Sequence, residues 1–453
     1  MGDLLAKVGE IEGLFCYDLF SRKTISQEEK PLYMIHQLGH KMLYQIEKFS
    51  GELCASLGKV PRRFVQEMLY GILSRGSVQL TEIARSLGEP ITLHKTHDRL
   101  SRNLSNPRLE VELEKSLIQI AAPHIGKDTL IIIDPSDIIK PYARKMEYLG
   151  EVRDGSKKEI GNGYWLYPVI GVDKKSGNII PLVNRLYSSL APDFISENDH
   201  ILDISAQVLK ATGNKGTIVM DKGGDRIKLL KPWLQNPDLD FIVNQRGDRH
   251  LIYRNGHHLC RDLVRECKLK YSEVITRITR DGKAKPYLLK FGFLPVRLPD
   301  CPKRQLYLVV TSGFGKEPFM LLTTKKMSRS RKVIWDVVES YLARWKVEET
   351  IRYIKQSYKL EDMRILTYQR MRNLITMVMA AAFFTCVHIG LKDRYTIMVG
   401  HILKAAKRIF GIPDFQYYSM ADGIQHILTK TSPKRRPKKP PDIFNGQRCL
   451  FDL

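Results

Sequence analysis

The order of strand-like and helix-like segments in the middle of the chain constrains the fold more than any other feature. A continuous apolar run over 129–138, TLIIIDPSDI, predicts a buried central strand. Strand-like runs over 164–173 and 179–189, joined by the turn sequence KKSGN, predict a hairpin. The first part of this region is therefore expected to contribute three strands in succession.

The next part alternates between helices and strands. Helical spacing over 197–212 precedes a strand-like run over 216–221, and a helical stretch over 223–235 precedes a run over 241–245. The predicted order is three strands, helix, strand, helix, strand. An RNase H-like sheet uses this order, so we expect an α/β fold whose RNase H-like core is a mixed five-stranded sheet with helices.

Residues 246–330 change pattern and charge. The segment contains short strand-like runs, at 273–279, 287–298, 305–313 and 319–325. It carries 19 Lys and Arg against 7 Asp and Glu, which is half of the net charge of +24 in the whole chain. We predict an all-β insertion whose basic surface grips DNA. A solvated charged surface is the alternative, although it would not favour one sign so strongly.

The first 120 residues have largely helical spacing. Residues 80–104 read as a short helix, a break at Gly88 and Pro90, and a second amphipathic helix. The second helix carries five Lys, Arg or His side chains, namely His94, Lys95, His97, Arg99 and Arg102. This pattern predicts a helix-turn-helix in a helical N-terminal DNA-binding domain, with Lys95 and Arg99 contacting DNA. Two ordinary helices with a solvated basic face are the alternative.

The C-terminal part is expected to be helical, beginning with one long helix from about residue 331. Residues 374–391 approach the length of a membrane span, but they include Thr376, Thr385 and His388, so we favour a buried core helix over a span. The proline-broken basic run 432–441 predicts a tail that touches phosphates without specificity. The expected divisions are 1–125, 126–245, 246–330, 331–372 and 373–453.

Composition narrows the class of function. The apolar content of 43% is enough for a sizeable core, and the excess of 73 Lys and Arg over 49 Asp and Glu favours a polyanionic partner. Nucleic acid is the leading partner and an anionic membrane surface the second. The start of the chain has no secretory pattern, and the seven scattered cysteines indicate reduced thiols in the cytoplasm. Without a phosphate-loop motif, we expect no nucleotide cofactor.

Acidic residues follow two of the predicted buried strands. Asp134 and Asp221 lie at strand ends, where side chains emerge beside one another, although an Asp there can also be a turn or cap residue. In the predicted helix 341–356, Tyr341, Arg344, Glu348 and Lys355 are spaced by three, four and seven residues. This spacing places all four side chains on one face of the helix, as a functional site would require. The alternative is that they form salt bridges on the helix surface.

This combination resembles the DDE transposases of bacterial insertion sequences, specifically the insertion-sequence-four type. The helix signature of that family is Tyr, two residues, Arg, three residues, Glu, six residues, Lys, and every gap is kept here. Its two Asp residues match Asp134 in IIIDPSD and Asp221 in MDKGGDR. The resemblance covers about 128 to 372, including the basic insertion between Asp221 and Glu348.

The resemblance implies DNA cleavage at the ends of the protein's own element, followed by joining of the 3′ hydroxyls to target DNA. Both steps are in-line displacements at phosphorus that two divalent ions assist. We expect Asp134 to bridge two Mg²⁺ ions, for which Mn²⁺ can substitute, with Asp221 and Glu348 each holding one. Phosphate contacts are expected from Tyr341, Arg344, Lys355, Arg246 and Arg249. A homodimer is expected in the synaptic complex, in the cytoplasm of a bacterium and associated with its nucleoid.

Some positions depart from the family pattern. Arg226 stands where an aromatic residue is common, and Asp137 could compete with Asp134 for metal. Residues 246–330 have no Trp to hold a flipped base of a DNA hairpin. Candidates to replace it are Tyr253, Tyr271, Tyr287, Phe291 and Phe293. Two other functions remain open, a catalytically idle transposase-derived DNA-binding protein and an RNase H-like nuclease.

Overall fold

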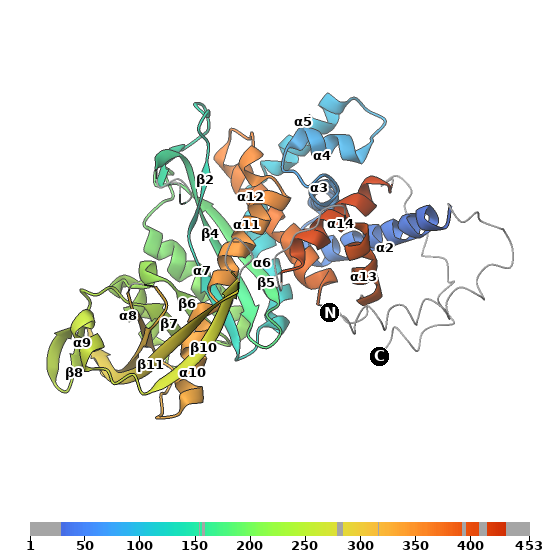
Figure 1. The fold of residues 1–453 in the computed structure, drawn as a ribbon. Helices are drawn as coiled ribbons and strands as arrows, with labels where there is room; N and C mark the ends of the chain where they lie inside the picture. Colours follow the sequence, from blue (N-terminus) through green and yellow to red (C-terminus); the bar gives the residue numbers. More distant parts are fainter. Residues whose placement is uncertain are drawn as a thin grey trace.

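The computed structural model describes residues 29–153, 155, 159–278, 284–315, 317–391, 396–406 and 415–431. Figure 1 shows helices at the two ends of the chain gathered on one side of the central sheet and the insertion on the other. The basic run 432–441 lies outside the described residues, as do Cys16 and Cys449. The cysteines within the described part are free thiols, as expected, namely Cys54, Cys260, Cys267, Cys301 and Cys386.

The described N-terminal region is helical, as the spacing predicted. It consists of α2 (Glu29–Leu53), α3 (Lys59–Arg75), α4 (Leu80–Leu87), α5 (Leu93–Leu104), α6 (Leu109–Ala121) and the short 3₁₀ helix η1 (Ala122–His124). The turn between α4 and α5 falls at the predicted break. Gly88 closes α4 with a φ of 54°, a left-handed conformation that suits glycine, and Thr92 caps α5 by accepting from the backbone of Lys95.

The core sheet has the strand order predicted from the sequence. Its five strands are β1 (Thr129–Ile133), β4 (Ile160–Asp173), β5 (Ile179–Tyr187), β6 (Thr217–Met220) and β7 (Asp240–Asn244). β4 pairs antiparallel with β1 and with β5, whereas β6 pairs parallel with β1 and with β7. Helix α7 (Glu197–Thr212) precedes β6, and η2 (Lys222–Gly224) and α8 (Ile227–Gln235) precede β7. This order and these directions are those of an RNase H-like core.

The strand predicted over 129–138 is in fact two strands. β1 ends at Ile133, and β2 (Ser136–Ile139) begins after Pro135 and pairs with β4. Pro135 has no N–H group for the ladder, so the strand is interrupted directly after Asp134. A further short strand, β3 (Gly150–Arg153), also pairs with β4 and was not predicted.

The insertion extends the core sheet instead of forming a separate one. Its strands are β8 (His250–Tyr253), β9 (Gly256–Leu259), β10 (Tyr271–Ile278), β11 (Ala284–Leu298), β12 (Cys301–Ser312) and β13 (Phe319–Thr323). β13 pairs antiparallel with β7, which joins the insertion to the core. One prediction needs correction, because the insertion is not purely β: the short helix α9 (Cys260–Glu266) buries Cys260 and Leu263.

The prediction of a single long helix from about residue 331 is also wrong. The segment forms α10 (Arg331–Leu342) and α11 (Trp345–Ser357), which are separated at Ala343 and Arg344. The backbone there changes to three-residue hydrogen bonds, from Arg344 N–H to Tyr341 O and from Val347 N–H to Arg344 O. The signature residues therefore lie on two helices and a tight turn.

The C-terminal region is helical and includes the long apolar helix. It contains η3 (Leu360–Asp362), α12 (Tyr368–Phe383), the π-helical segment η4 (Phe384–Ile389), α13 (Thr396–Ala405) and α14 (Tyr417–Thr429). Residues Tyr368–Ile389 are long and apolar enough to cross a membrane by length and composition, but 94% of the apolar window is buried inside the protein. The prediction of a core helix is confirmed.

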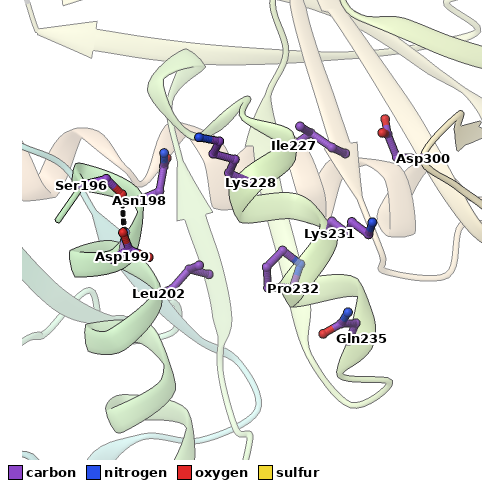
Figure 2. A pocket seen from close by; sticks show the side chains of 10 residues that line it. All are labelled: Ser196, Asn198, Asp199, Leu202, Ile227, Lys228, Lys231, Pro232, Gln235 and Asp300. Atoms are coloured by element: carbon purple, nitrogen blue, oxygen red, sulfur yellow. Dashed lines mark hydrogen bonds between the residues drawn. The ribbon is translucent and has the colours of Figure 1, made fainter.

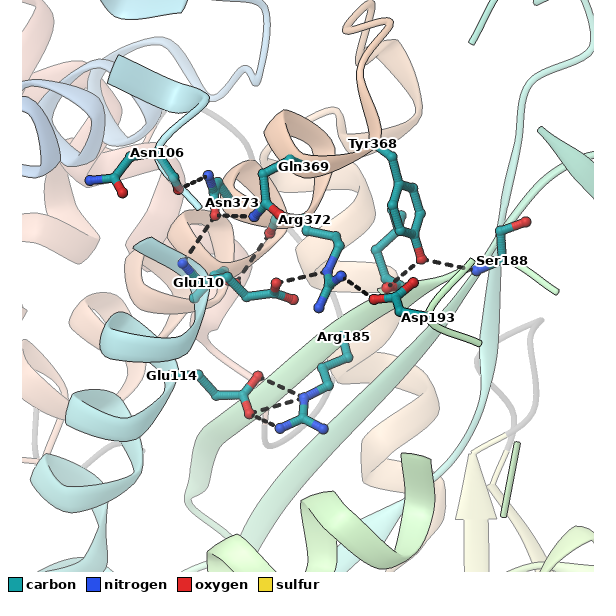
Figure 3. A network of polar contacts seen from close by, with 12 residues as sticks. Asn106, Glu110, Glu114, Arg185, Ser188, Asp193, Tyr368, Gln369, Arg372 and Asn373 are labelled. Atoms are coloured by element: carbon teal, nitrogen blue, oxygen red, sulfur yellow. Dashed lines mark hydrogen bonds and ion pairs between the residues drawn. The ribbon is translucent and has the colours of Figure 1, made fainter. Parts of the chain in front are cut away.

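A polar network ties the N-terminal helices to the core (Figure 3). Glu114 on α6 accepts from Arg185 on β5 at 3.0 Å, and Arg372 on α12 lies 2.7 Å from Glu110. The Asn373 amide of α12 donates to the carbonyl of Leu104, at the end of α5, at 2.7 Å. Helices α5 and α6 are therefore held by fixed contacts to the sheet and to α12.

Candidate active site

The two strand-end aspartates lie side by side at one edge of the sheet. The register of β1 and β6 pairs Ile132 with Val219, so Asp134 and Asp221 each follow that pair by two residues. Both strands run in the same direction, so their carboxyl ends meet at this edge. Asp221 also caps the following turn, because its Oδ1 accepts from the N–H of Gly223 at 2.7 Å.

Arg344 brings the glutamate to the same place. One guanidinium nitrogen donates to Asp134 Oδ2 at 2.7 Å and another to Glu348 Oε1 at 2.9 Å. The side chains of Asp134 and Arg344 are 14% and 11% exposed, whereas that of Glu348 is 51% exposed. The site is thus buried on the strand side and open to solvent on the side of α11.

The pKa of Asp134 is raised by burial and by the other acids in this site. Burial raises it to about 7, Arg344 opposes the rise, and the charges of Asp221 and Glu348 add to it. The pKa of Arg344 is raised by Asp134, Tyr341, Glu348 and Asp221 against the opposing effect of burial, which is the largest single influence. The three predicted carboxylates are therefore close enough to interact electrostatically.

Tyr341 lies in the core, away from solvent. Its side chain is buried, and its hydroxyl accepts from the amide of Asn244 at 3.0 Å. The Arg344 guanidinium is 5.9 Å from the centre of the Tyr341 ring. Tyr341 therefore lies next to Arg344 on its buried side. Its hydroxyl is not accessible to DNA in this position. Asn244 was not predicted; its place at the end of β7 was the only signal for it.

Lys355 lies two turns further along α11. Its ammonium group is 3.7 Å from Asp137 and 3.6 Å from Glu361, distances longer than a direct hydrogen bond. Asp137 lies on β2, and it also accepts from the N–H of Gly155 at 3.4 Å. Asp137 is thus paired with Lys355, whereas Asp134 is paired with Arg344 and faces the other two acids.

The remaining predicted DNA contacts divide into exposed and paired side chains. Arg246 and Lys95 are exposed. Arg249 instead donates to the buried carboxylate of Asp225 at 2.7 Å. Arg99 donates to Glu67 at 2.6 Å and to Glu89 at 2.9 Å. Arg249 and Arg99 therefore have structural partners inside the protein.

The positions that departed from the family pattern have partners as well. Arg226 forms an ion pair with Glu197 at the start of α7. Among the aromatic candidates for base stacking, Phe291 is fully buried and packs on Trp335, and Tyr253 is buried too. Tyr287 is partly exposed and packs against Phe314 at 5.0 Å between ring centres.

A hollow of about 460 Å³ lies outside this site, between α7 and α8 (Figure 2). It is lined in part by Asn198, Lys228, Lys231 and Asp300, and by none of the predicted site residues. The three acids therefore lie apart from this hollow, at the edge of the sheet.

The donor chemistry of the site fits a divalent ion. Three carboxylates supply the hard oxygen ligands that Mg²⁺ and Mn²⁺ prefer. As the side chains stand, Arg344 lies between Asp134 and Glu348, and the described residues contain no group of three or more His, Cys, Asp or Glu placed to hold an ion.

An RNase H-like core with acids directly after β1 and β6 and on α11, at one sheet edge, defines a phosphoryl-transfer enzyme of the DDE class. A family model described as transposase DDE domain matches residues 125–384, more than half of the chain. The chain belongs to this family. It is a DNA transposase, an enzyme that cleaves DNA and transfers the cut strand, and divalent metal ions are the cofactors of its family.

No curated protein matches the chain. Among solved structures, the chain is similar to that described as "Cryo-EM structure of piggyBac transposase synaptic complex with hairpin DNA", with 11% identity and a TM-score of 0.40. The match covers 93% of this chain and 84% of the other.

Proposed function

We propose that this chain is the transposase of an insertion sequence of the insertion-sequence-four type. It binds the ends of its own element, cleaves them and joins the 3′ hydroxyls to target DNA. One observation carries the proposal: Arg344 contacts both Asp134 and Glu348, so the signature turn and the strand-end acid form one site. The Tyr, Arg, Glu, Lys spacing of this type supports the finer assignment.

The metal-binding role is assigned to Asp134, Asp221 and Glu348, with two Mg²⁺ ions as the physiological cofactors. When bound, such ions activate the attacking oxygen and stabilise the leaving oxygen of a phosphodiester. Glu348 is half exposed on α11, so its side chain is free to turn toward the strand ends. Asp134 is held in the interior and fixes the position of the site.

Positioning of the DNA backbone is assigned to the cations around the acids. Lys355 has no contact shorter than 3.6 Å among its two ion-pair partners, so its ammonium group gives up no close hydrogen bond to them when a phosphate binds. Arg246 is exposed at the start of the insertion. Arg344 serves as the counter-charge of Asp134 and Glu348, and bound divalent ions would take over this role and leave Arg344 available to a phosphate.

The functional unit is proposed to be a homodimer in the synaptic complex. An element has two ends, and each end needs one cluster of Asp134, Asp221 and Glu348. Two copies of the chain on one pair of ends supply this number. The net charge of +24 on each protomer makes dimerisation on DNA easier than dimerisation in free solution, because DNA screens the repulsion between the copies.

The test uses a supercoiled plasmid that carries the DNA flanking the gene on both sides of a marker. Asp134→Asn, Asp221→Asn and Glu348→Gln are each expected to abolish cleavage and strand transfer in Mg²⁺. The matched control is Asp128→Asn, because Asp128 is a 70% exposed acid just before β1. Near wild-type strand transfer in any of the three variants would remove that residue from the site.

A second measurement does not depend on activity. Mn²⁺ is expected to raise the melting temperature of the wild type and of Asp128→Asn, because an ion that binds only the folded state stabilises it. The three acid variants should lose most of this shift. An equal Mn²⁺ shift in all five proteins would place the metal elsewhere.

A further inference from the structure

The chain continues past the first catalytic acid along the line of β1. Strands β1 and β2 pair with the same strand, β4, and keep the same register on either side of Asp134. Ile139, the last residue of β2, is five residues after Asp134, so β2 ends roughly 17 Å beyond it. Figure 1 shows β2 beside β4 at the end of the sheet remote from β10 and β11. The loop 140–149 therefore begins beyond the acids, on the continuation of the strand that leads to them.

The start of this loop is fixed by Lys140. Its side chain is 6% exposed, and its ammonium group donates to the backbone carbonyls of Glu361 and Met363 at 2.5 and 2.8 Å. Its backbone N–H donates to the carbonyl of Asn162 on β4 at 2.7 Å. Glu361 and Met363 lie in and after η3, the turn that follows α11. The loop is thus joined to the helix that carries Glu348.

The end of the loop is fixed as well. Met146 is buried, and the N–H of Glu147 donates to the carbonyl of Leu366 at 2.8 Å. The Glu147 carbonyl accepts from the hydroxyl of Tyr164 at 2.6 Å, and its carboxylate accepts from the N–H of Tyr368 at 2.7 Å. Both ends are held by β4 and by the segments around η3 and α12. The tip between them, residues 141–145, is therefore held at a fixed place relative to the acids.

The tip carries an aromatic ring and two cations in the open. Tyr142 is 95% exposed, more than any other large apolar or aromatic side chain in the described part of the chain. Arg144 and Lys145 are exposed beside it. Within the described residues, none of these three side chains has a hydrogen bond, an ion pair or a ring contact. A free ring and two unpaired charges thus project from a rigid base.

This combination matches the chemistry of a DNA end. An aromatic side chain stacks on any base whose face is uncovered, and the terminal base at a strand break has one uncovered face. Arg and Lys bind the phosphates of the backbone. Tyr142 is eight residues after Asp134, so their Cα atoms lie at most about 28 Å apart. This is less than one turn of duplex DNA, which is ~34 Å, so the tip reaches bases within one turn of the acids.

We propose that the tip 141–145 holds the cut end of the DNA, with Tyr142 stacked on a terminal base and Arg144 and Lys145 on the adjacent phosphates. The contact keeps the end beside Asp134 and Asp221 between cleavage and strand transfer. Stacking uses only the face of a base, so the contact does not depend on base identity. The inference goes beyond the proposed function, because it rests on DNA cleavage and not on which element is cut.

The first experiment compares variants of Tyr142 in single-turnover reactions with the plasmid described above. Tyr142→Ala should slow strand transfer roughly tenfold to a hundredfold, whereas Tyr142→Phe and Tyr142→Trp should stay within about twofold of wild type because both keep a ring. Melting temperatures should not change, since the side chain is exposed. Tyr44→Ala is the matched control, because Tyr44 is an exposed tyrosine on α2.

Two outcomes of this comparison would overturn the inference. One is a rate of strand transfer within about twofold of wild type in Tyr142→Ala. The other is a loss in Tyr142→Phe as large as that in Tyr142→Ala, which would mean that the hydroxyl and not the ring makes the contact.

The cations are tested through the salt dependence of binding. Each lost phosphate contact should reduce the slope of log affinity against log salt by about 0.9, so the double variant Arg144→Ala and Lys145→Ala should lose about 1.8. Lys115→Ala should keep the wild-type slope, because Lys115 is exposed on α6, outside the loop. An unchanged slope in the double variant would overturn the phosphate contacts.

Photochemical cross-linking tests the stacking contact without cleavage. The probe is a short duplex with a free 3′ end, in which 5-iodouracil replaces the bases of the last turn one at a time. Wild type should cross-link through Tyr142, identified by mass spectrometry of the peptides, and Tyr142→Ala should lose this product. The absence of a cross-link at Tyr142 from every position would overturn the inference.

The two assays also separate this inference from the proposed function. If the plasmid is not cut but the cross-link forms at Tyr142, the loop assignment stands and the proposed element ends are wrong. If the plasmid is cut and joined normally by Tyr142→Ala, the loop assignment fails and the transposase function stands.

Discussion

Arg344 donates to Asp134 at 2.7 Å although the two residues are 210 positions apart in the sequence. The same guanidinium reaches Glu348 one helical turn away at 2.9 Å. A single cation therefore lies between the first and the third predicted catalytic acids. It neutralises charge that would otherwise be buried without a partner, and it holds the strand end against the signature turn.

Replacement of Arg344 should lower stability as well as activity. Arg344→Ala leaves the buried Asp134 carboxylate unpaired, and removal of one partner of a buried pair costs about 3–5 kcal/mol. The measurement is the free energy of unfolding in denaturant. Arg352→Ala is the control, because Arg352 is 54% exposed and its loss should cost no more than about 1 kcal/mol. Equal values for the two variants would mean that the bridge does not stabilise the fold.

Asp134→Asn should reduce the dependence of stability on pH. The pKa of Asp134 is raised from 3.8 to about 7, chiefly by burial. The folded state therefore keeps a proton that the unfolded state has lost, and stability falls as pH rises from about 4 to 7. Asn resembles the protonated acid and does not titrate, but it also leaves the buried guanidinium of Arg344 with Glu348 as its remaining acidic partner, so the expected effect is a flatter curve of stability against pH. Melting curves from pH 4 to 8 check it, with Asp128→Asn expected to keep the wild-type dependence.

Lys355→Ala should slow cleavage. The pair of Lys355 with Glu361 is half exposed and adds little to stability. The pair with Asp137 joins side chains that are 18% and 14% exposed, so the melting temperature is measured together with the rate, whereas a phosphate held beside Glu348 lowers the barrier. We expect a loss of roughly a hundredfold in single-turnover cleavage of DNA that is already bound, or about 2.7 kcal/mol. A wild-type rate would make the side chain structural.

DNA affinity should fall steeply with salt. The insertion carries an excess of twelve positive charges over residues 246–330, and these displace counterions from the DNA. Neutralisation of about six phosphates predicts a slope near −5 in a plot of log affinity against log salt. A salt titration with unrelated duplex DNA measures the electrostatic part of the affinity alone. A slope near zero would mean that the excess of positive charge does not contribute to binding.

Asn373→Leu should loosen the N-terminal helices from the core. The change leaves the carbonyls of Leu104 and Asn106 and the N–H of Glu110 without their amide partner, at a cost of about 1–3 kcal/mol for each group that water cannot reach. Gln369→Ala, which removes only one donor to Asn373, should cost less. Protection of α5 and α6 amides in hydrogen exchange is the measurement, and unchanged protection in Asn373→Leu would contradict the proposed anchoring.

The local sequence was sufficient for the elements of the core. Alternating and continuous apolar runs specify strands, and helical spacing specifies α7 at its observed bounds, because these periods follow from backbone geometry within one segment. The two aspartates could be placed at the same sheet edge for the same reason. The signature spacing was enough to select Glu348 and its neighbours from among the many charged residues of the chain.

Only the tertiary structure determined how those residues are used. The break at Ala343 and Arg344 contains no proline or glycine from which it could have been predicted. Because of the break, Tyr341 is buried in the core while Arg344 faces Asp134. Likewise, Arg99 and Arg249 are basic residues in predicted DNA-binding segments, yet each forms ion pairs with acids from other elements. Sequence fixes which charges exist and on which segment they lie, but long-range packing decides which of them are neutralised inside the protein and which remain free for DNA.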